Sequence, residues 1–122
     1  QVGDGGMTGP GVGVDLVEVE RIGKLVRDPA FLKRVFTAEE IAYCCRKKNV
    51  AQHFAVRFAA KEAILKALGH KGIALKDIGV RNLPSGQPVP ALRGKWKRIE
   101  KKIRLSLAHT KEYAVAMAVV EK

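Results

Sequence analysis

The chain has 122 residues, of which 47% are hydrophobic and 29% charged, a size and composition typical of one small globular domain. Lys and Arg number 23 against 12 Asp and Glu, so the net charge is +11, which favours an anionic partner: nucleic acid, a phosphorylated ligand, an acidic protein or a membrane surface. Two adjacent cysteines exclude a disulfide framework, and no apolar run approaches the ~20 residues of a membrane span.

We therefore expect a cytoplasmic protein without a membrane segment. The first residues, QVGDGGMTGPG, lack the basic and apolar regions of a signal peptide. We expect residues 1–10 to be a disordered leader, of which 1–6 are a remnant placed before a native Met7. Residues 11–122 are expected to form a single domain.

The first predicted strand covers residues 11–17 and carries Asp15 inside an apolar run. A helix over residues 18–27 should follow, with one apolar stripe facing the core. Three basic residues share its opposite face: Arg21, Lys24 and Arg27. The face is either an ordinary solvated surface or a docking surface for an acidic partner.

A second helix is predicted from Thr37 to about residue 46, because Thr37 and Glu40 match the capping-box pattern. The long central helix should cover residues 50–68 and stop at Gly69. Small residues occupy one side of that helix and would allow another element to approach closely: Ala55, Ala59, Ala60, Ala63 and Ala67.

The second half of the chain reads as strands over 73–83 and 88–92, a short helix over 94–103, and strands over 104–109 and 113–120. Mixed helices and hairpin-type strands predict the α+β class, with a small antiparallel sheet packed around the long central helix.

Three charged residues, Arg57, Lys61 and Glu62, interrupt the nearly all-apolar central helix. Burying an unpaired charge is costly, so each needs a partner or a wet cleft. In the simplest structural explanation, the Lys61 side chain extends past apolar neighbours so that its ammonium group reaches water. Glu62 would then pair with Lys66, four residues later on the same helix.

Asp15 raises the same question, because aspartate is a poor strand residue. It lies either at an edge position or strand end open to solvent, or in half of a magnesium site with a second carboxylate from elsewhere in the fold; composition alone does not identify Glu62 as that carboxylate. A third polar cluster, SLAHT, ends an apolar strand at residues 106–110. Ser106 should face away from Leu105 and Leu107, and a lone histidine such as His109 is more often structural than catalytic.

Taken together, GVGVDLVEVERI, FAVRFAAKEAILKALG and SLAHTKEYAVA closely resemble the holo-acyl-carrier-protein synthases, the short members of the 4′-phosphopantetheinyl transferase superfamily. The resemblance covers residue 11 to about residue 120. It implies the phosphopantetheinyl transferase fold and transfer of 4′-phosphopantetheine from coenzyme A to a serine of apo-acyl carrier protein, for fatty acid biosynthesis. It also implies Mg²⁺, adenosine 3′,5′-bisphosphate as the other product, and a homotrimer with active sites between subunits.

The resemblance implies roles for individual residues. Asp15 and Glu62 become magnesium ligands, and Arg57 and Lys61 become phosphate contacts. Two further segments line the coenzyme A site: Gly86, Gln87 and Pro88, and Ser106, His109 and Thr110. Glu62, a magnesium-bound water or His109 could accept the serine proton, and Asp15, Lys61, Glu62 and His109 form the predicted catalytic set. Ala108 departs from the family, which commonly has Ser or Thr there.

The basic face Arg21–Lys24–Arg27 would suit the acidic carrier protein. The main alternative is a basic nucleic-acid-binding domain without catalysis. It explains the net charge but leaves Asp15 and Glu62 unexplained, and only 6% of residues are aromatic. A second alternative, a catalytically silent partner subunit, does not explain why the carboxylates, Lys61 and His109 are all present.

Overall fold

The computed structural model describes residues 11–70 and 72–121, so the predicted leader lies outside the described residues. The helices are α1 (Val19–Leu25), α2 (Pro29–Val35), α3 (Ala38–Cys45) and α4 (Val50–Ala67), with 3-10 helices η1 (Leu75–Asp77) and η2 (Gly94–Lys102). The strands are β1 (Gly11–Glu18), β2 (Ile78–Asn82), β3 (Pro88–Leu92), β4 (Ile103–His109) and β5 (Tyr113–Val120).

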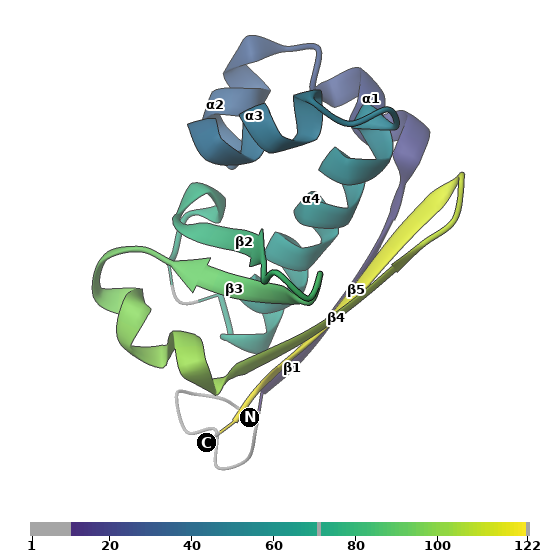
Figure 1. Ribbon diagram of the computed structural model, residues 1–122. Helices are drawn as coiled ribbons and strands as arrows, with labels where there is room; N and C mark the ends of the chain where they lie inside the picture. The colour runs from purple at the N-terminus through teal and green to yellow at the C-terminus, as the bar shows by residue number, and fades with distance from the viewer. Residues whose placement is uncertain (1–10, 71, 122) are drawn as a thin grey trace.

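The strands form two antiparallel sheets, where the sequence predicted one. The long sheet has the order β1-β5-β4, and β2 and β3 form a separate hairpin. Figure 1 shows α4 along one face of the long sheet, with the hairpin beside it and α2 and α3 above. The α+β class and the central position of the long helix are confirmed.

Close contact between α4 and the sheet depends on small side chains. The alanines predicted to face a neighbouring element are all buried, and they meet a row of buried alanines on β5. Gly13 of β1 lies where a Cβ atom would overlap the Ala63 carbonyl oxygen and come within 2.7 Å of the Ala67 nitrogen. Any larger residue at position 13 would therefore push β1 away from α4.

The predicted start of α3 is confirmed in detail. Thr37 Oγ1 accepts a hydrogen bond from the Glu40 N–H at 3.1 Å, and the Glu40 carboxylate accepts one from the Thr37 N–H at 3.0 Å. The residue before the cap, Phe36, packs edge-on against Phe54 of α4, with ring centroids 5.0 Å apart. The local cap and this aromatic contact together fix α3 on α4.

Three segments differ from the prediction. Helix α2 was not predicted, although Asp28 caps it through the Ala30 N–H and Pro29 occupies its first turn. The strand expected over 73–83 is confined to β2, because a 3-10 turn precedes it. The helix expected over 94–103 is a 3-10 helix, and α1 ends at Leu25, which leaves Arg27 just beyond the helix.

The outer face of the long sheet is apolar and exposed. Val14 of β1 pairs with Met117 of β5, and Leu16 pairs with Val115, so these side chains share the face turned away from α4. Val14, Leu16 and Met117 are 54%, 64% and 48% exposed. A contiguous apolar surface of this kind typically marks an interaction site. Among the described residues no helix is long and apolar enough to cross a membrane.

Candidate active site

A pocket of about 390 Å³ lies between the first half of α4, the β2–β3 hairpin and β4. Five of the residues predicted to contact coenzyme A line it: Arg57, Gly86, Pro88, Ser106 and His109. Tyr43, His53 and Asn82 are among the other lining residues. The structure thus brings together segments that are far apart in the sequence and that carried the resemblance.

Arg57 is held at the base of this pocket with donors to spare. Its guanidinium stacks over the Tyr43 ring at 4.3 Å, and its Nη2 donates to Asn82 Oδ1 at 2.9 Å. Asn82 is oriented in turn by donating from Nδ2 to the Gly86 carbonyl at 2.9 Å. The Arg57 Nε atom is buried without a hydrogen-bond partner among the described residues. A guanidinium that is fixed in this way and lines the pocket is well suited to bind a phosphate.

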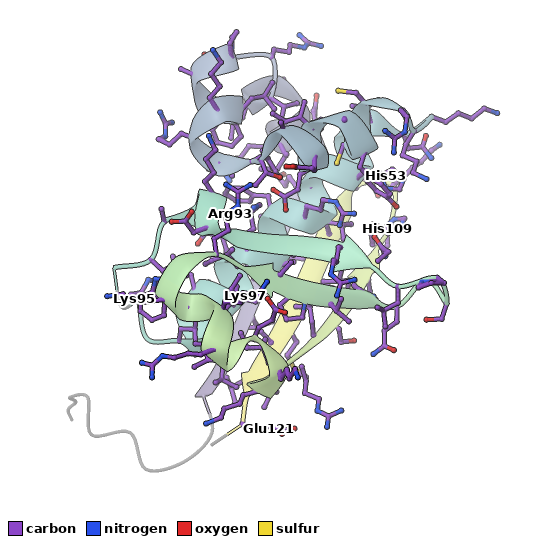
Figure 2. All side chains as sticks on the ribbon, turned by 60° about the vertical axis from the view of Figure 1, so that its left-hand side comes forward. His53, Arg93, Lys95, Lys97, His109 and Glu121 are labelled. Carbon is purple, nitrogen blue, oxygen red and sulfur yellow. The ribbon has the colours of Figure 1, made fainter. Side chains whose placement is uncertain are left out.

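Two histidines line one side of the pocket, near Lys47 and Arg57. Figure 2 shows His53 of α4 and His109 at the end of β4 close together. Burial lowers the pKa of His53, and the nearby Lys47, Arg57 and His109 lower it further. An anionic ligand in the pocket would oppose this effect and favour the charged form of His53.

Two predicted residues lie at the margins of the pocket. Thr110 Oγ1 accepts from the Glu112 and Tyr113 N–H groups, and the Thr110 carbonyl accepts from Gln52 at 3.3 Å, so Thr110 shapes the β4–β5 turn. Gln87 lies in the β2–β3 turn, where its carbonyl accepts from the Leu83 N–H. Neither residue is among those that line the pocket.

Asp15 and Glu62 lie close together between β1 and α4. Asp15 Oδ1 accepts from Lys66 Nζ at 3.3 Å, whereas its Oδ2 is buried with no partner among the described residues. Burial raises the pKa of Glu62, and the charge of Asp15 raises it further. Two repelling carboxylates, one with an unsatisfied oxygen, fit a hard divalent cation such as Mg²⁺. The described residues contain no group of three metal-ligating side chains, so other ligands would have to come from outside this set.

The predicted ion pair between Glu62 and Lys66 is not observed. Lys66 forms its ion pair with Asp15 and also donates to the Val14 carbonyl at 3.1 Å. Among the described residues, Glu62 takes part in no ion pair within 4.0 Å. Lys66 therefore moderates the Asp15 charge and leaves Glu62 the less neutralised of the two carboxylates.

The raised pKa of Glu62 predicts a pH-dependent stability change in metal-free protein. Between the ordinary and the raised pKa, the folded state binds more protons than the unfolded state, so stability falls as pH rises through this window. Glu62→Gln should therefore melt at a higher temperature than the wild type at pH 7 in EDTA, and the difference should shrink toward pH 4. Glu112→Gln, which changes an exposed carboxylate, is the control. Identical melting of both variants at pH 7 would contradict the assignment.

The predicted phosphate contact of Lys61 does not fit the structure. Its ammonium is fully buried and its three donors are taken by Glu40 at 2.7 Å, the Ile78 carbonyl at 2.8 Å and the Leu75 carbonyl at 3.1 Å. No donor is left for a phosphate. The alternative prediction, that the Lys61 side chain reaches water, is also wrong, because this side chain is fully buried.

The chain matches a known protein family over nearly its whole length. The sequence model of the 4′-phosphopantetheinyl transferase superfamily matches residues 11–118 of this chain. A holo-[acyl-carrier-protein] synthase of Syntrophus aciditrophicus is 45% identical over 121 residues, covering 91% of this chain and 94% of the relative. One from Thermodesulfovibrio yellowstonii is 47% identical over 113 residues, covering 90% and 96%. The chain is a member of the holo-acyl-carrier-protein synthase family.

Solved structures of holo-acyl-carrier-protein synthases share the fold. The enzyme of Bacillus anthracis, in complex with CoA (3′,5′-ADP), has a TM-score of 0.77 and 34% identity, and the match covers 92% of this chain and 96% of that one. The Helicobacter pylori enzyme, in complex with coenzyme A, has a TM-score of 0.78 and 30% identity, covering 90% and 99%.

Sequence reasoning missed several residues of this holo-acyl-carrier-protein synthase site. Lys66 contacts Asp15, whereas its position one turn after Glu62 predicts a pair with Glu62. Tyr43 and Asn82 hold Arg57, and no pattern in the sequence links either to it. Ala108, the departure from the family, pairs with Val115 on the apolar outer face of the sheet.

Proposed function

We propose that this protein transfers 4′-phosphopantetheine from coenzyme A to a serine hydroxyl of apo-acyl carrier protein, in the cytoplasm and for fatty acid biosynthesis. The products are holo-acyl carrier protein and adenosine 3′,5′-bisphosphate. The observation that carries the proposal is the Asp15–Glu62 carboxylate pair, with its unsatisfied buried oxygen, in a member of this family. The relatives' names and the neighbours solved with coenzyme A support the choice of substrates.

In the proposed reaction the serine oxygen bonds to the β-phosphorus while the bond from that phosphorus to the bisphosphate oxygen breaks. Arg57 binds a phosphate of coenzyme A, with Gly86, Gln87, Pro88, Ser106, His109 and Thr110 around the ligand. Asp15 and Glu62 would hold Mg²⁺, which supplies positive charge where negative charge develops on the phosphoryl group and the leaving bisphosphate. Glu62 and His109 are the side chains available to take the serine proton.

The distribution of these residues supports a shared active site. Asp15 and Glu62 are not among the residues that line the pocket holding Arg57 and His109. The outer face of the long sheet, which includes Val14, Leu16 and Met117, is exposed in the single chain. We propose that three copies associate through this face, so that the carboxylates of one subunit meet the pocket of its neighbour.

The basic face Arg21–Lys24–Arg27 is proposed to bind the acidic carrier protein. All three residues are exposed, and Lys24 makes only a loose contact with Glu20, at 3.9 Å between two exposed side chains. Such a pair is worth little in water, so Lys24 can exchange it for a carboxylate of a partner.

Charge reversal tests this docking surface. Arg21→Glu with Lys24→Glu should raise the KM for carrier protein by roughly tenfold or more and leave the KM for coenzyme A nearly unchanged. The wild type should also lose carrier affinity as salt rises, because exposed charges are screened over roughly 8 Å at physiological ionic strength. Steady-state kinetics at two salt concentrations measure both effects. A variant that loses coenzyme A affinity instead would show that the face serves the nucleotide.

The proposed function is tested directly by incubating the protein with coenzyme A, Mg²⁺ and an apo-acyl carrier protein, and weighing the carrier by mass spectrometry. A mass increase equal to one phosphopantetheine group is expected, with none in EDTA. An unmodified carrier under all conditions would refute the proposal. Neither the family nor the relatives support the alternative of a nucleic-acid-binding domain.

A further inference from the structure

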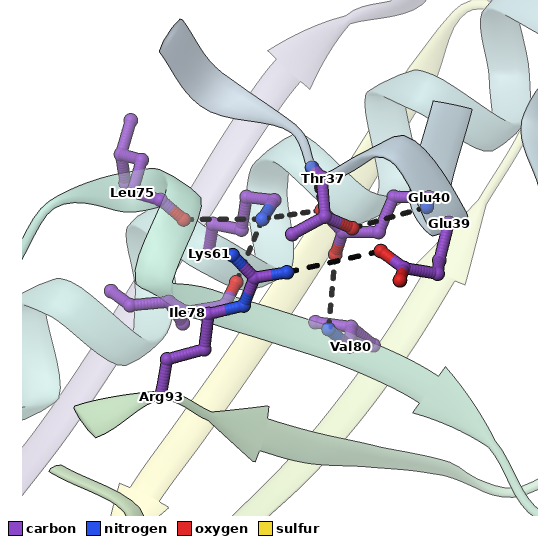
Figure 3. Close-up of polar contacts among 8 residues, drawn as sticks. All are labelled: Thr37, Glu39, Glu40, Lys61, Leu75, Ile78, Val80 and Arg93. Atoms are coloured by element: carbon purple, nitrogen blue, oxygen red, sulfur yellow. Dashed lines mark hydrogen bonds and ion pairs between the residues drawn. The ribbon is translucent and has the colours of Figure 1, made fainter. Parts of the chain in front are cut away.

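The buried ion pair between Glu40 and Lys61 lies outside the pocket, yet it connects the elements that build it. The two charged groups are 2.7 Å apart, and the side chains are 6% and 0% exposed. Figure 3 shows Lys61 also donating to the carbonyls of Leu75 and Ile78. One ammonium group therefore ties α4 to α3, η1 and β2.

Glu40 uses both of its oxygens in the same network. Oε1 accepts from the Thr37 N–H in the capping box, and Oε2 accepts from the Val80 N–H of β2 at 3.1 Å. Burial lowers the pKa of Lys61, and the neighbouring Glu40 opposes that change, so the charged form is kept by its partner. Every polar atom of the pair is thus satisfied within the protein.

A buried ion pair of this kind contributes little to the free energy of unfolding. Removing two charges from water costs about as much as their attraction returns, and apolar residues of similar volume often stabilise a core equally well. A buried ion pair does impose a geometry, because any sliding of β2 along α4 would break several charge-assisted hydrogen bonds at once.

The geometry that it imposes reaches the pocket. Arg57 lies one helical turn before Lys61 on α4, and Asn82 lies two residues after Val80 on β2. The Arg57–Asn82 hydrogen bond, at 2.9 Å, therefore spans the same two elements as the bond from Lys61 to the Ile78 carbonyl. The position of Asn82 that orients Arg57 depends on where β2 sits against α4.

We propose that Glu40 and Lys61 are positioning residues that fix β2 on α4, so that Asn82 holds the Arg57 guanidinium in the pocket. The part of this inference that concerns coenzyme A rests on the proposed function; the part that concerns Arg57 does not. It assigns to Lys61 an indirect role in place of the direct phosphate contact.

The test uses Glu40→Gln, Lys61→Met and the double variant, with Glu39→Gln as a matched control. Glu39 is the neighbouring carboxylate on the same helix, but it is exposed and pairs only loosely with Arg93, at 3.8 Å. Each single change should destabilise the fold, because it leaves one buried charge unpaired, and the double variant should recover much of the loss. Glu39→Gln should behave like the wild type throughout.

Affinity for coenzyme A, measured by calorimetry, separates positioning from stability. The double variant should bind about tenfold more weakly than the wild type despite its recovered stability, since a charge-assisted hydrogen bond is misplaced. Arg57→Ala should weaken binding by about the same factor in the wild type and add little in the double variant. A double variant that regains wild-type stability and also wild-type affinity would overturn the inference.

A ligand-free measurement keeps the two proposals apart. In the ¹⁵N NMR spectrum, the Arg57 Nε–H should give one sharp signal in the wild type and in Glu39→Gln, and a broadened or shifted one in the double variant. If the wild type does not bind coenzyme A, the proposed function fails while this signal still decides the positioning role. Should the double variant not fold, Glu40→Gln alone serves, because glutamine keeps the cap acceptor; an unchanged Arg57 signal would then overturn the inference.

Discussion

Asp15→Ala and Glu62→Ala should each lower phosphopantetheine transfer by roughly a hundredfold or more while leaving the chain folded. Each change removes one hard oxygen ligand from a site in which the described residues supply only two carboxylates. Transfer is measured as the mass increase of the carrier at limiting Mg²⁺, and folding by circular dichroism. Glu112→Ala, an exposed carboxylate change, should keep wild-type activity.

Thermal melting gives an independent readout of the same pair. Adding Mg²⁺ should raise the melting temperature of the wild type, since a ligand that binds only the folded state stabilises it. The rise should be lost in both alanine variants and should weaken as pH falls and Glu62 takes up its proton, because its pKa is raised by burial. Normal turnover by both variants, or an unchanged magnesium response, would refute the metal assignment.

Disrupting the proposed trimer interface on the outer face of the long sheet should also greatly lower the transfer activity. The wild type should sediment at micromolar concentration with about three times its chain mass of 13.3 kDa. Leu16→Glu, on the most exposed part of this face, should give monomers and lose most of the activity, because like charges would meet in an apolar interface. Lys33→Glu, an exposed change on α2 away from the sheet, should remain a trimer.

Mixing two inactive variants tests whether the site is shared. Asp15→Ala lacks one carboxylate and His109→Ala lacks a pocket residue, so each should have little activity alone. If the site lies between subunits, trimers formed by refolding a mixture contain some interfaces with both residues intact and regain part of the activity. Mixtures that stay inactive, or a stable and active monomer, would defeat the shared-site proposal.

The parts of the fold that could be predicted are those with local signals. The Thr37–Glu40 capping box set the start of α3, and the long apolar run with Gly69 set the ends of α4. Helix α2 was missed because it has neither a capping box nor a long apolar stripe, and it is held by Phe31 packing on Phe36 and Phe58. Residues 73–77 are apolar enough for a strand, but β3 pairs only with residues 78–82.

The candidate site was predictable in its residues more than in its arrangement. Helical periodicity identified Arg57, Lys61 and Glu62 as charges in need of partners, but a helical wheel does not say which element faces each one. Glu40 was recognised only as a cap, and its second role as the partner of Lys61 depends on the approach of α3 and β2. The outcome for Lys61 shows that a charge in an apolar stripe can belong to the scaffold next to the site.

Gly13 determines how closely β1 approaches α4. The two carboxylates of the pair stand on different elements, Asp15 two residues after Gly13 on β1 and Glu62 beside Ala63 on α4. The distance between the two carboxylates therefore depends on how closely β1 approaches α4. At Gly13 only a hydrogen atom faces the Ala63 carbonyl oxygen. A methyl group at position 13 would push β1 away from α4 and increase the distance between the two carboxylates without contacting either one. In the proposed metal site, the spacing of the two ligands would therefore depend on a residue that has no side chain.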